Sequence, residues 1–117
     1  MSNLIFRIGD IFWVDFSVDS VGHEYQKKRP ALIIQSDRIT KISNLITVLP
    51  LTSKSTKIFS EDILVCKDER NLLHEDSLIK VKHIMSFDQQ RFYHKIGEVD
   101  EAILQKVKQY LKLHFDL

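Results

Sequence analysis

The sequence is poor in the residues from which several kinds of site are built. It has three glycines, two prolines and one cysteine among 117 residues. A single cysteine allows neither an intrachain disulfide nor a cysteine-based zinc site, and the scattered glycines form no phosphate-cradling loop. No apolar run approaches the roughly 20 residues of a membrane span, and the N-terminus lacks the pattern of a signal peptide. We therefore expect a cytoplasmic protein without membrane association.

Other familiar signatures are missing as well. The sequence contains no Walker loop, no nucleophile elbow and no paired-histidine zinc helix, and its five histidines show no metal-ligand spacing. We therefore predict no metal and no cofactor. Cys66 follows three aliphatic residues and is interpreted as a core thiol. The net charge of +1 gives no bulk attraction to nucleic acid, so any such binding must come from local clusters.

What is present is an ordinary globular composition, with 44% hydrophobic and 28% charged residues. The length favours one domain over residues 1–117. Alternating or short apolar runs predict strands at residues 11–16, 29–35, 45–51, 63–67 and 77–81, and a short one at 94–97. Pro50 lacks a backbone N–H and is expected at a sheet edge or a bulge. Five strands with short connections indicate a small β-barrel.

The last third of the chain has a helical pattern. Asp88 can cap a short helical turn within residues 87–92. Ile103, Val107 and Leu111 then recur four residues apart, which predicts an amphipathic helix packed on the barrel. The predicted fold is mainly β with one C-terminal α-helix.

A cationic run leads directly into one of the predicted strands. Lys27, Lys28 and Arg29 precede Pro30 and a short apolar run. Because proline disfavours a helical conformation for the residue before it, Arg29 is expected to be extended, with its guanidinium at the mouth of a core strand. Such a group can hold a phosphate. A cationic run is nevertheless more often only a solvated loop.

Thr52 follows another predicted strand. If that strand lies beside the one that begins at Arg29, the Thr52 hydroxyl and the guanidinium share one end of the barrel. RNA cleavage requires few further groups, because the ribose 2′-hydroxyl is an internal nucleophile. The protein need only align this hydroxyl and stabilise the charge that develops on the phosphate. The residues after Thr52 are also typical of a plain turn, which spacing alone favours.

Several segments, in their order and spacing, resemble the MazF/PemK family of bacterial toxins, which are sequence-selective endoribonucleases of toxin–antitoxin systems. The resemblance rests on residues 9–16, 22–24, 29–34, 48–53, 76–77, 87–92 and 95–97. It implies an SH3-like (CcdB/MazF-type) small β-barrel with a C-terminal helix, a homodimer, and a cognate antitoxin as partner.

The resemblance also implies an activity. Arg29 and Thr52 match the catalytic pair of the family. The implied reaction is metal-independent attack of the 2′-hydroxyl in single-stranded RNA, which leaves a 2′,3′-cyclic phosphate and a 5′-hydroxyl. Arg29 would stabilise the transition state and Thr52 would hydrogen-bond the phosphate. The residues expected to contact RNA are Glu24, Lys27, Lys28, Ser53, Lys54 and His83.

One position departs from the family pattern. Where many relatives read Gln-Ile-Arg-Thr, residues 83–86 read His-Ile-Met-Ser, so Met85 replaces a cation. Cleavage preference therefore does not transfer from relatives. Histidine side chains can gain or lose a proton near neutral pH, so His83 is either a proton-transfer group or a simple surface histidine.

Two other functions remain open. A CcdB-like topoisomerase inhibitor shares the barrel, but such toxins end in Trp-Gly-Ile whereas this sequence ends in His-Phe-Asp-Leu. A plain RNA-binding barrel, with catalysis lost through Met85, would bind RNA and release it intact. Incubation with RNA separates the three hypotheses.

Overall fold

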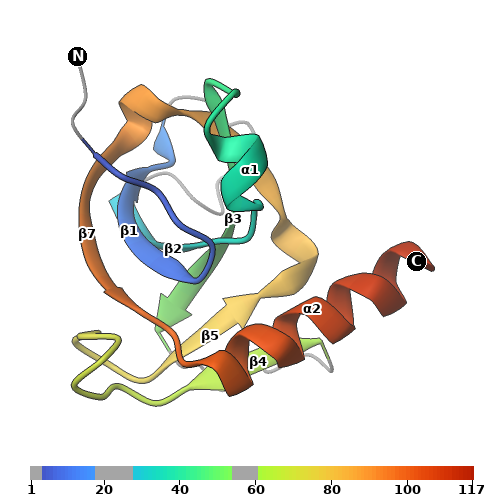
Figure 1. The fold of residues 1–117 in the computed structure, drawn as a ribbon. Helices are drawn as coiled ribbons and strands as arrows, with labels where there is room; N and C mark the ends of the chain where they lie inside the picture. The colour runs from blue at the N-terminus through green and yellow to red at the C-terminus, as the bar shows by residue number, and fades with distance from the viewer. Residues whose placement is uncertain (1–3, 18–27, 54–60) are drawn as a thin grey trace.

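The computed structural model describes residues 4–17, 28–53 and 61–117. The strands in these ranges are β1 (Asp10–Asp15), β2 (Lys28–Ile33), β3 (Leu45–Ser53), β4 (Asp62–Val65), β5 (Ser77–Lys80), β6 (Met85–Asp88) and β7 (Phe92–Glu98). The helices are α1 (Asp37–Thr40) and α2 (Glu101–Phe115), with 3₁₀ turns η2 (Val81–His83) and η3 (Gln89–Arg91) (Figure 1). The predicted strands and C-terminal helix are present, whereas α1 and β6 were not predicted.

The strands form one antiparallel sheet that coils on itself. Their order is β4-β5-β3-β2-β1-β7, and β6 pairs with β3 beside this path. In Figure 1, β1, β2, β3 and β7 curve around a common centre, while β4 and β5 extend beneath α2. The pairing among the described strands does not close into a ring, so the barrel is open. The mainly β fold with a C-terminal helix is nevertheless as predicted.

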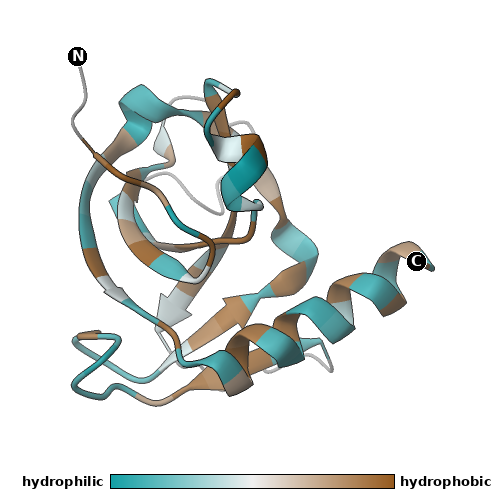
Figure 2. Cartoon of the chain, viewed as in Figure 1, coloured by the Kyte–Doolittle hydropathy of each residue, from teal (hydrophilic) through white to brown (hydrophobic). Residues whose placement is uncertain are grey.

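Two hydrophobic cores lie on opposite faces of the central strands, because successive strand residues point to opposite sides. The first, the barrel core, lies inside the coiled sheet and comprises Phe6, Phe12, Val14, Phe16, Ala31, Ile33, Ile46, Val48 and Phe92. The second, the helix core, lies between the sheet and α2 and comprises Ile11, Leu32, Leu49, Leu51, Ile63, Val65, Leu73, Ile79, Val81, Val99, Leu104 and Val107. Figure 2 shows hydrophobic and hydrophilic residues interleaved along α2, and Leu104 and Val107 are the buried α2 residues of the helix core. Burial on both faces explains why β2 has a continuous apolar run.

Helix α2 begins and packs as its sequence predicts. The Asp100 carboxylate accepts the backbone N–H of Ile103 at 2.9 Å, which caps the first turn. Leu104 and Val107 are buried against the helix core. The later turns project beyond the sheet (Figure 1), and Leu113 is 81% exposed there. None of the helices in the described ranges combines the length and apolar character that crossing a membrane requires.

The prediction for Cys66 is wrong, because its side chain is exposed. Ile63 and Val65 of β4 point into the helix core. Strand alternation therefore turns Leu64 and Cys66 outward. Only one face of β4 is covered by the helix core, so an apolar run in this strand does not bury every residue.

Pro50 was expected at a sheet edge or a bulge, but it does not lie in an edge strand. It lies opposite Ala31 within β3, a strand that has partners on both flanks. On the other flank, however, β6 pairs only as far as Val48 and β5 begins at Leu51. Pro50 therefore occupies the gap between two partner strands, where the missing N–H costs no ladder hydrogen bond.

Candidate functional site

Arg29 and Thr52 lie on neighbouring strands whose register aligns them. Strands β2 and β3 pair antiparallel, with Ala31 opposite Pro50 and Leu32 opposite Leu49. Continuing this register by two residues sets Arg29 opposite Thr52. Both residues follow the alternation of the barrel-core face, and both are half-buried. The adjacency on which the sequence argument depended is therefore present.

Each of the two residues is also fixed by a second strand. Arg29 lies opposite Val14 of β1, and its Nε atom is buried. Thr52 lies opposite Leu78 of β5. The pair thus sits where β2 begins and β3 ends, with paired backbone on both sides. A guanidinium and a hydroxyl held in this way can donate hydrogen bonds to one anion.

Two of the residues expected to contact RNA already have partners in the protein. Ser53 is exposed at the end of β3 and donates from its Oγ to Glu75 Oε2 at 2.6 Å. The Lys28 ammonium lies 4.4 Å from the centre of the Tyr93 ring, a cation–π distance. The expected contacts Glu24, Lys27 and Lys54 lie outside the described residues.

His83 and Met85 lie beside β3, farther from its C-terminal end than Thr52. His83 ends η2, which fills the stretch between the β5 and β6 pairings alongside the middle of β3. Met85 lies opposite Val48 and packs against the barrel core. Val48 is four residues before Thr52 in β3, so Met85 lies about 13 Å from Thr52 along an extended strand. The position that departs from the expected family pattern is therefore half-buried and apolar.

The structure adds a cavity that the sequence analysis did not single out. Its volume is about 560 Å³, and it is lined by Trp13, Pro30, Leu51, Ser53, Leu73, His74, Glu75, Ser77, His94, Lys95 and Ile96. These residues come from β1, β2, β3, β5, β7 and the segment before β5. The one sequence signal was Trp13, which alternates with the buried Phe12 and Val14 and so lies on the other face of β1. The histidines gave no signal, because no spacing links them.

A buried carboxylate lies close to one wall of this cavity. Asp10 is 4% exposed, and its carboxylate accepts the backbone N–H of Arg7 at 3.2 Å. The Lys95 ammonium lies 3.3 Å from Asp10 and 3.2 Å from Glu98. Burial raises the pKa of the Asp10 carboxyl, an effect that Lys95 only partly offsets. Burial alone would lower the pKa of Lys95, but hydrogen bonds to Glu98 and Asp10 outweigh it and raise that pKa.

Removing this cation should destabilise the protein in a pH-dependent way. We expect Lys95→Met to lower the free energy of unfolding by about 1–2 kcal/mol near neutral pH, since Asp10 would ionise in a buried site without its partner. The pKa of Asp10 is higher in the folded state than in the unfolded state, so ionisation of Asp10 lowers the free energy of unfolding at high pH. This loss disappears as the pH falls through the folded-state pKa toward the unfolded value. The difference in free energy of unfolding between the parent and Lys95→Met should therefore become smaller as the pH is lowered toward about 4. Urea unfolding at several pH values measures it.

The matched control is Lys106→Met on the exposed side of α2, which should change stability by less than about 0.5 kcal/mol. A deficit for Lys95→Met that is constant with pH would contradict the role given to Asp10.

No three His, Cys, Asp or Glu side chains in the described part of the chain are grouped so as to hold a metal ion. The donors at this end of the barrel are instead a guanidinium and hydroxyls.

The comparison with known families decides the assignment. The model of the PemK-like, MazF-like toxins of type II toxin–antitoxin systems matches residues 7–115. The chain belongs to this family. It is 31% identical to endoribonuclease MazF9 of Mycobacterium tuberculosis, over 95% of this chain and 97% of that protein. It is 29% identical to endoribonuclease EndoA of Bacillus subtilis, over 97% of each.

Solved structures of this toxin family have the same fold. MazF from Deinococcus radiodurans superposes with a TM-score of 0.81 at 20% identity, over 98% of this chain and 100% of that chain. An endoribonuclease solved with its cognate antitoxin, from a mycobacterial species, gives a TM-score of 0.76 at 14% identity, over 96% of each chain. The predicted family and the predicted MazF-type fold class are both confirmed.

Proposed function

We propose that this MazF/PemK-family toxin is an endoribonuclease that cleaves single-stranded RNA at a phosphate held by Arg29 and Thr52. The observation that supports the proposal is the β2–β3 register, whose continuation by two residues past the Ala31–Pro50 pair aligns Arg29 with Thr52 at the end of the barrel. Curated relatives named endoribonucleases support the reaction class.

The bonds that form and break lie within the RNA, and these two side chains stabilise the negative charge that develops on the phosphate. The 2′-oxygen attacks the adjacent phosphorus and loses its proton to a base, either His83 or a solvent water. The bond from phosphorus to the 5′-oxygen breaks, and that oxygen gains a proton from the same kind of group. The products are a 2′,3′-cyclic phosphate and a 5′-hydroxyl. Arg29 donates N–H hydrogen bonds to the phosphoryl oxygens as negative charge grows, and a guanidinium, which stays protonated in proteins, does not act as the base. Thr52 donates its hydroxyl to the same phosphate.

The other expected contacts have supporting roles in this proposal. Lys28, together with Lys27 and Lys54, attracts the RNA backbone by charge, while Ser53 and Glu24 contribute polar contacts. His83 remains the sequence-predicted candidate for moving a proton. Met85 offers no charge to a phosphate, so the base preference of relatives is not carried over.

Partners complete the proposal. A cognate antitoxin binds and silences the toxin, which is supported by similar structures of MazE–MazF complexes from Deinococcus radiodurans. The family resemblance further implies a homodimer. The cytoplasm is the proposed location, since a cellular RNA substrate is met there.

The test is incubation of the purified protein with a long RNA of mixed sequence in excess chelator. We expect cleavage that the chelator does not slow, and fragments whose 5′-hydroxyl ends accept phosphate from a kinase without prior dephosphorylation. Mapping the ends gives the site preference at the same time.

The outcomes discriminate the alternatives. RNA that is bound but intact would indicate a plain RNA-binding barrel. RNA that is neither bound nor cut, together with inhibition of a topoisomerase, would indicate a CcdB-like toxin. Cleavage that stops in chelator would contradict the metal-independent mechanism.

A further inference from the structure

The cavity lined by Trp13, which we call the Trp13 cavity, lies next to the proposed catalytic pair. Pro30 and Ser53 line it and directly follow Arg29 and Thr52 in the sequence. Strand alternation places the cavity on the opposite face of the sheet from the pair. Both faces meet where β2 begins and β3 ends. An RNA strand that crosses this end of the barrel can therefore place a phosphate on the face with Arg29 and Thr52. A neighbouring part of the same nucleotide can then enter the cavity on the other face.

The walls of the cavity combine a flat aromatic side chain with aliphatic groups. Trp13 is half-buried and lies opposite Pro30 in the β1–β2 register. Leu51, Leu73 and Ile96 supply further apolar surface. The volume of about 560 Å³ is within the usual range of small-ligand sites, roughly 300–1,000 Å³. A planar, largely apolar group fits this surface best.

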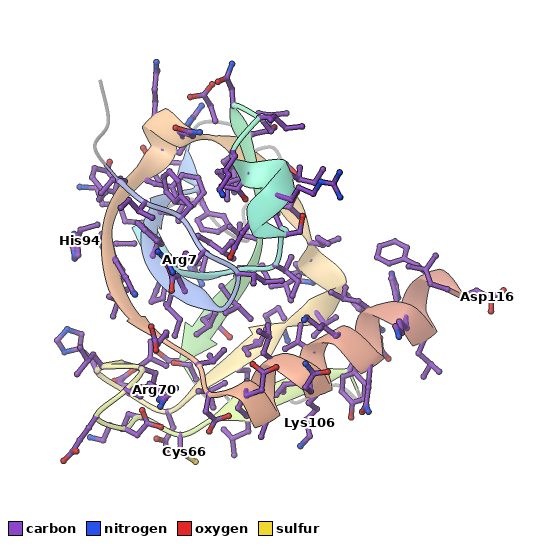
Figure 3. All side chains as sticks on the ribbon, viewed as in Figure 1. Arg7, Cys66, Arg70, His94, Lys106 and Asp116 are labelled. Atoms are coloured by element: carbon purple, nitrogen blue, oxygen red, sulfur yellow. The ribbon has the colours of Figure 1, made fainter. Side chains whose placement is uncertain are left out.

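The rim is polar and carries both donors and acceptors. His74 and His94 are exposed, and Figure 3 shows His94 on the outer side of β7. The Glu75 carboxylate accepts from Ser53 at 2.6 Å, and Lys95 is held by Asp10 and Glu98. An apolar peptide side chain would desolvate these groups without pairing them, which is costly. A group with a polar edge around an aromatic plane would satisfy them.

We propose that the Trp13 cavity receives one unpaired nucleobase of the RNA, next to the phosphate held by Arg29 and Thr52. The base stacks on the Trp13 indole and presents its polar edge to the rim. Proteins that read single-stranded RNA commonly hold splayed bases on aromatic side chains in this way. The inference rests on the proposed endoribonuclease function and adds the group that selects the nucleotide beside the cut.

The decisive test compares cleavage maps of three variants on one long RNA of mixed sequence. Trp13→Leu keeps apolar bulk but removes the aromatic face, so we expect lost preference at one nucleotide position flanking the cut. Its kcat/KM should fall on the order of 10-fold, mainly through KM, since stacking favours binding. Trp13→Phe should keep the preference. Phe115→Leu alters an aromatic side chain 48% exposed at the far end of α2 and should match the parent.

His94→Ala is a second test of the cavity, which applies even if the Trp13→Leu protein does not fold. Because His94 is exposed, this protein should fold and show altered preference at the same flanking position. Folded Trp13→Leu and His94→Ala proteins with the map and rate of the parent would overturn the base-binding role while leaving the endoribonuclease intact. A parent that cuts no RNA would instead refute the proposed function itself.

The emission of Trp13 provides an independent measurement, because it is the one tryptophan of the chain. Arg29→Ala protein, expected to hold RNA without cutting it rapidly, should show an altered emission that saturates together with RNA binding in a filter assay. An unchanged emission at saturating RNA would overturn the proposal and leave the cavity to another occupant, such as a side chain of the antitoxin.

Discussion

An Arg29→Ala protein is expected to cleave RNA about 10²–10³ times more slowly than the parent, the loss typical of removing one preorganised donor to a developing oxyanion. Arg29 is half-buried at the start of β2, paired with Val14 on one side and aligned with Thr52 on the other. Its guanidinium is thus positioned before RNA arrives. Arg29→Lys should recover only part of the rate, since an ammonium cannot donate the same planar pair of bonds. Single-turnover cleavage rates measure both effects.

Lys28→Ala is the matched control, because it removes a cation one residue away. Lys28 is exposed, and its ammonium lies over Tyr93 rather than beside Thr52. We expect weaker RNA binding with little change in the single-turnover rate at saturating protein, and a deficit that shrinks as salt rises. Equal losses of rate for Lys28→Ala and Arg29→Ala, both shown to be folded, would remove the distinction between catalysis and electrostatic attraction.

Thr52→Val tests the second member of the same pair. Valine has nearly the shape of threonine and suits a strand, so the backbone pairing with Leu78 should persist. The rate should fall by up to about 10²-fold, and the double variant with Arg29→Ala should lose less than the product of the two single losses, because both act on one phosphate. Multiplicative losses would indicate that the two side chains act independently.

The position of this pair could be predicted from the sequence because several local signals agree there. Pro30 restricts Arg29 to extended backbone, and the apolar run after it has the length of a buried strand. Thr52 likewise follows an apolar run. The sequence did not give the alignment of the two strands, because β2 and β3 are buried on both faces and their runs carry no alternation from which a register could be read.

Other elements were missed although the sequence carried a signal for them. Ser36 caps α1 through a bond from the Ile39 N–H to its Oγ, at 3.2 Å, and serine is a typical helix cap. Met85 and Phe87 face the barrel core while Ser86 between them is exposed, which is the period of a strand. Both elements have four residues, too few for periodicity to separate them from loop.

The Trp13 cavity could not be predicted in the same way. Trp13, His74 and His94 come from separate segments. They line one cavity because β7 pairs with β1 and because the segment before β5 is hydrogen-bonded to β7 through the Arg70 carbonyl and the Glu98 N–H. No spacing in the sequence indicates that these three residues line one cavity. Cys66 fails for a related reason, since the composition of β4 does not say which of its faces is covered.

Gly97→Ala is expected to destabilise the protein by about 3 kcal/mol, at the upper end of ordinary overpacking costs. A Cβ at Gly97 would lie 2.3 Å from the carbonyl oxygen of Asn71 and 2.6 Å from that of Arg70. These are backbone atoms, so no side-chain rotation relieves the clash. The backbone N–H of Glu98 also donates to the Arg70 carbonyl at 3.2 Å, which ties the loop to β7.

The loop that would have to move is itself braced. The Asn71 side chain is buried, accepts the N–H groups of Asp68 and Leu73 at 3.0 Å each, and donates to the Cys66 carbonyl at 2.9 Å. Shifting the loop would break these bonds, whose polar groups are costly to leave unpaired. Thermal and urea unfolding of the purified variant measure the loss.

Gly9→Ala separates this steric effect from the usual cost of replacing glycine. Gly9 has φ +92°, so alanine there is strained, but its Cβ would meet only Leu104 Cδ2 at 3.5 Å. We expect a smaller loss of about 1–2 kcal/mol, and equal losses would contradict the steric argument. Because the same loop leads into Leu73 and His74 of the Trp13 cavity, Gly97→Ala protein that remains folded should cut with altered base preference, whereas Gly9→Ala protein should keep the preference of the parent.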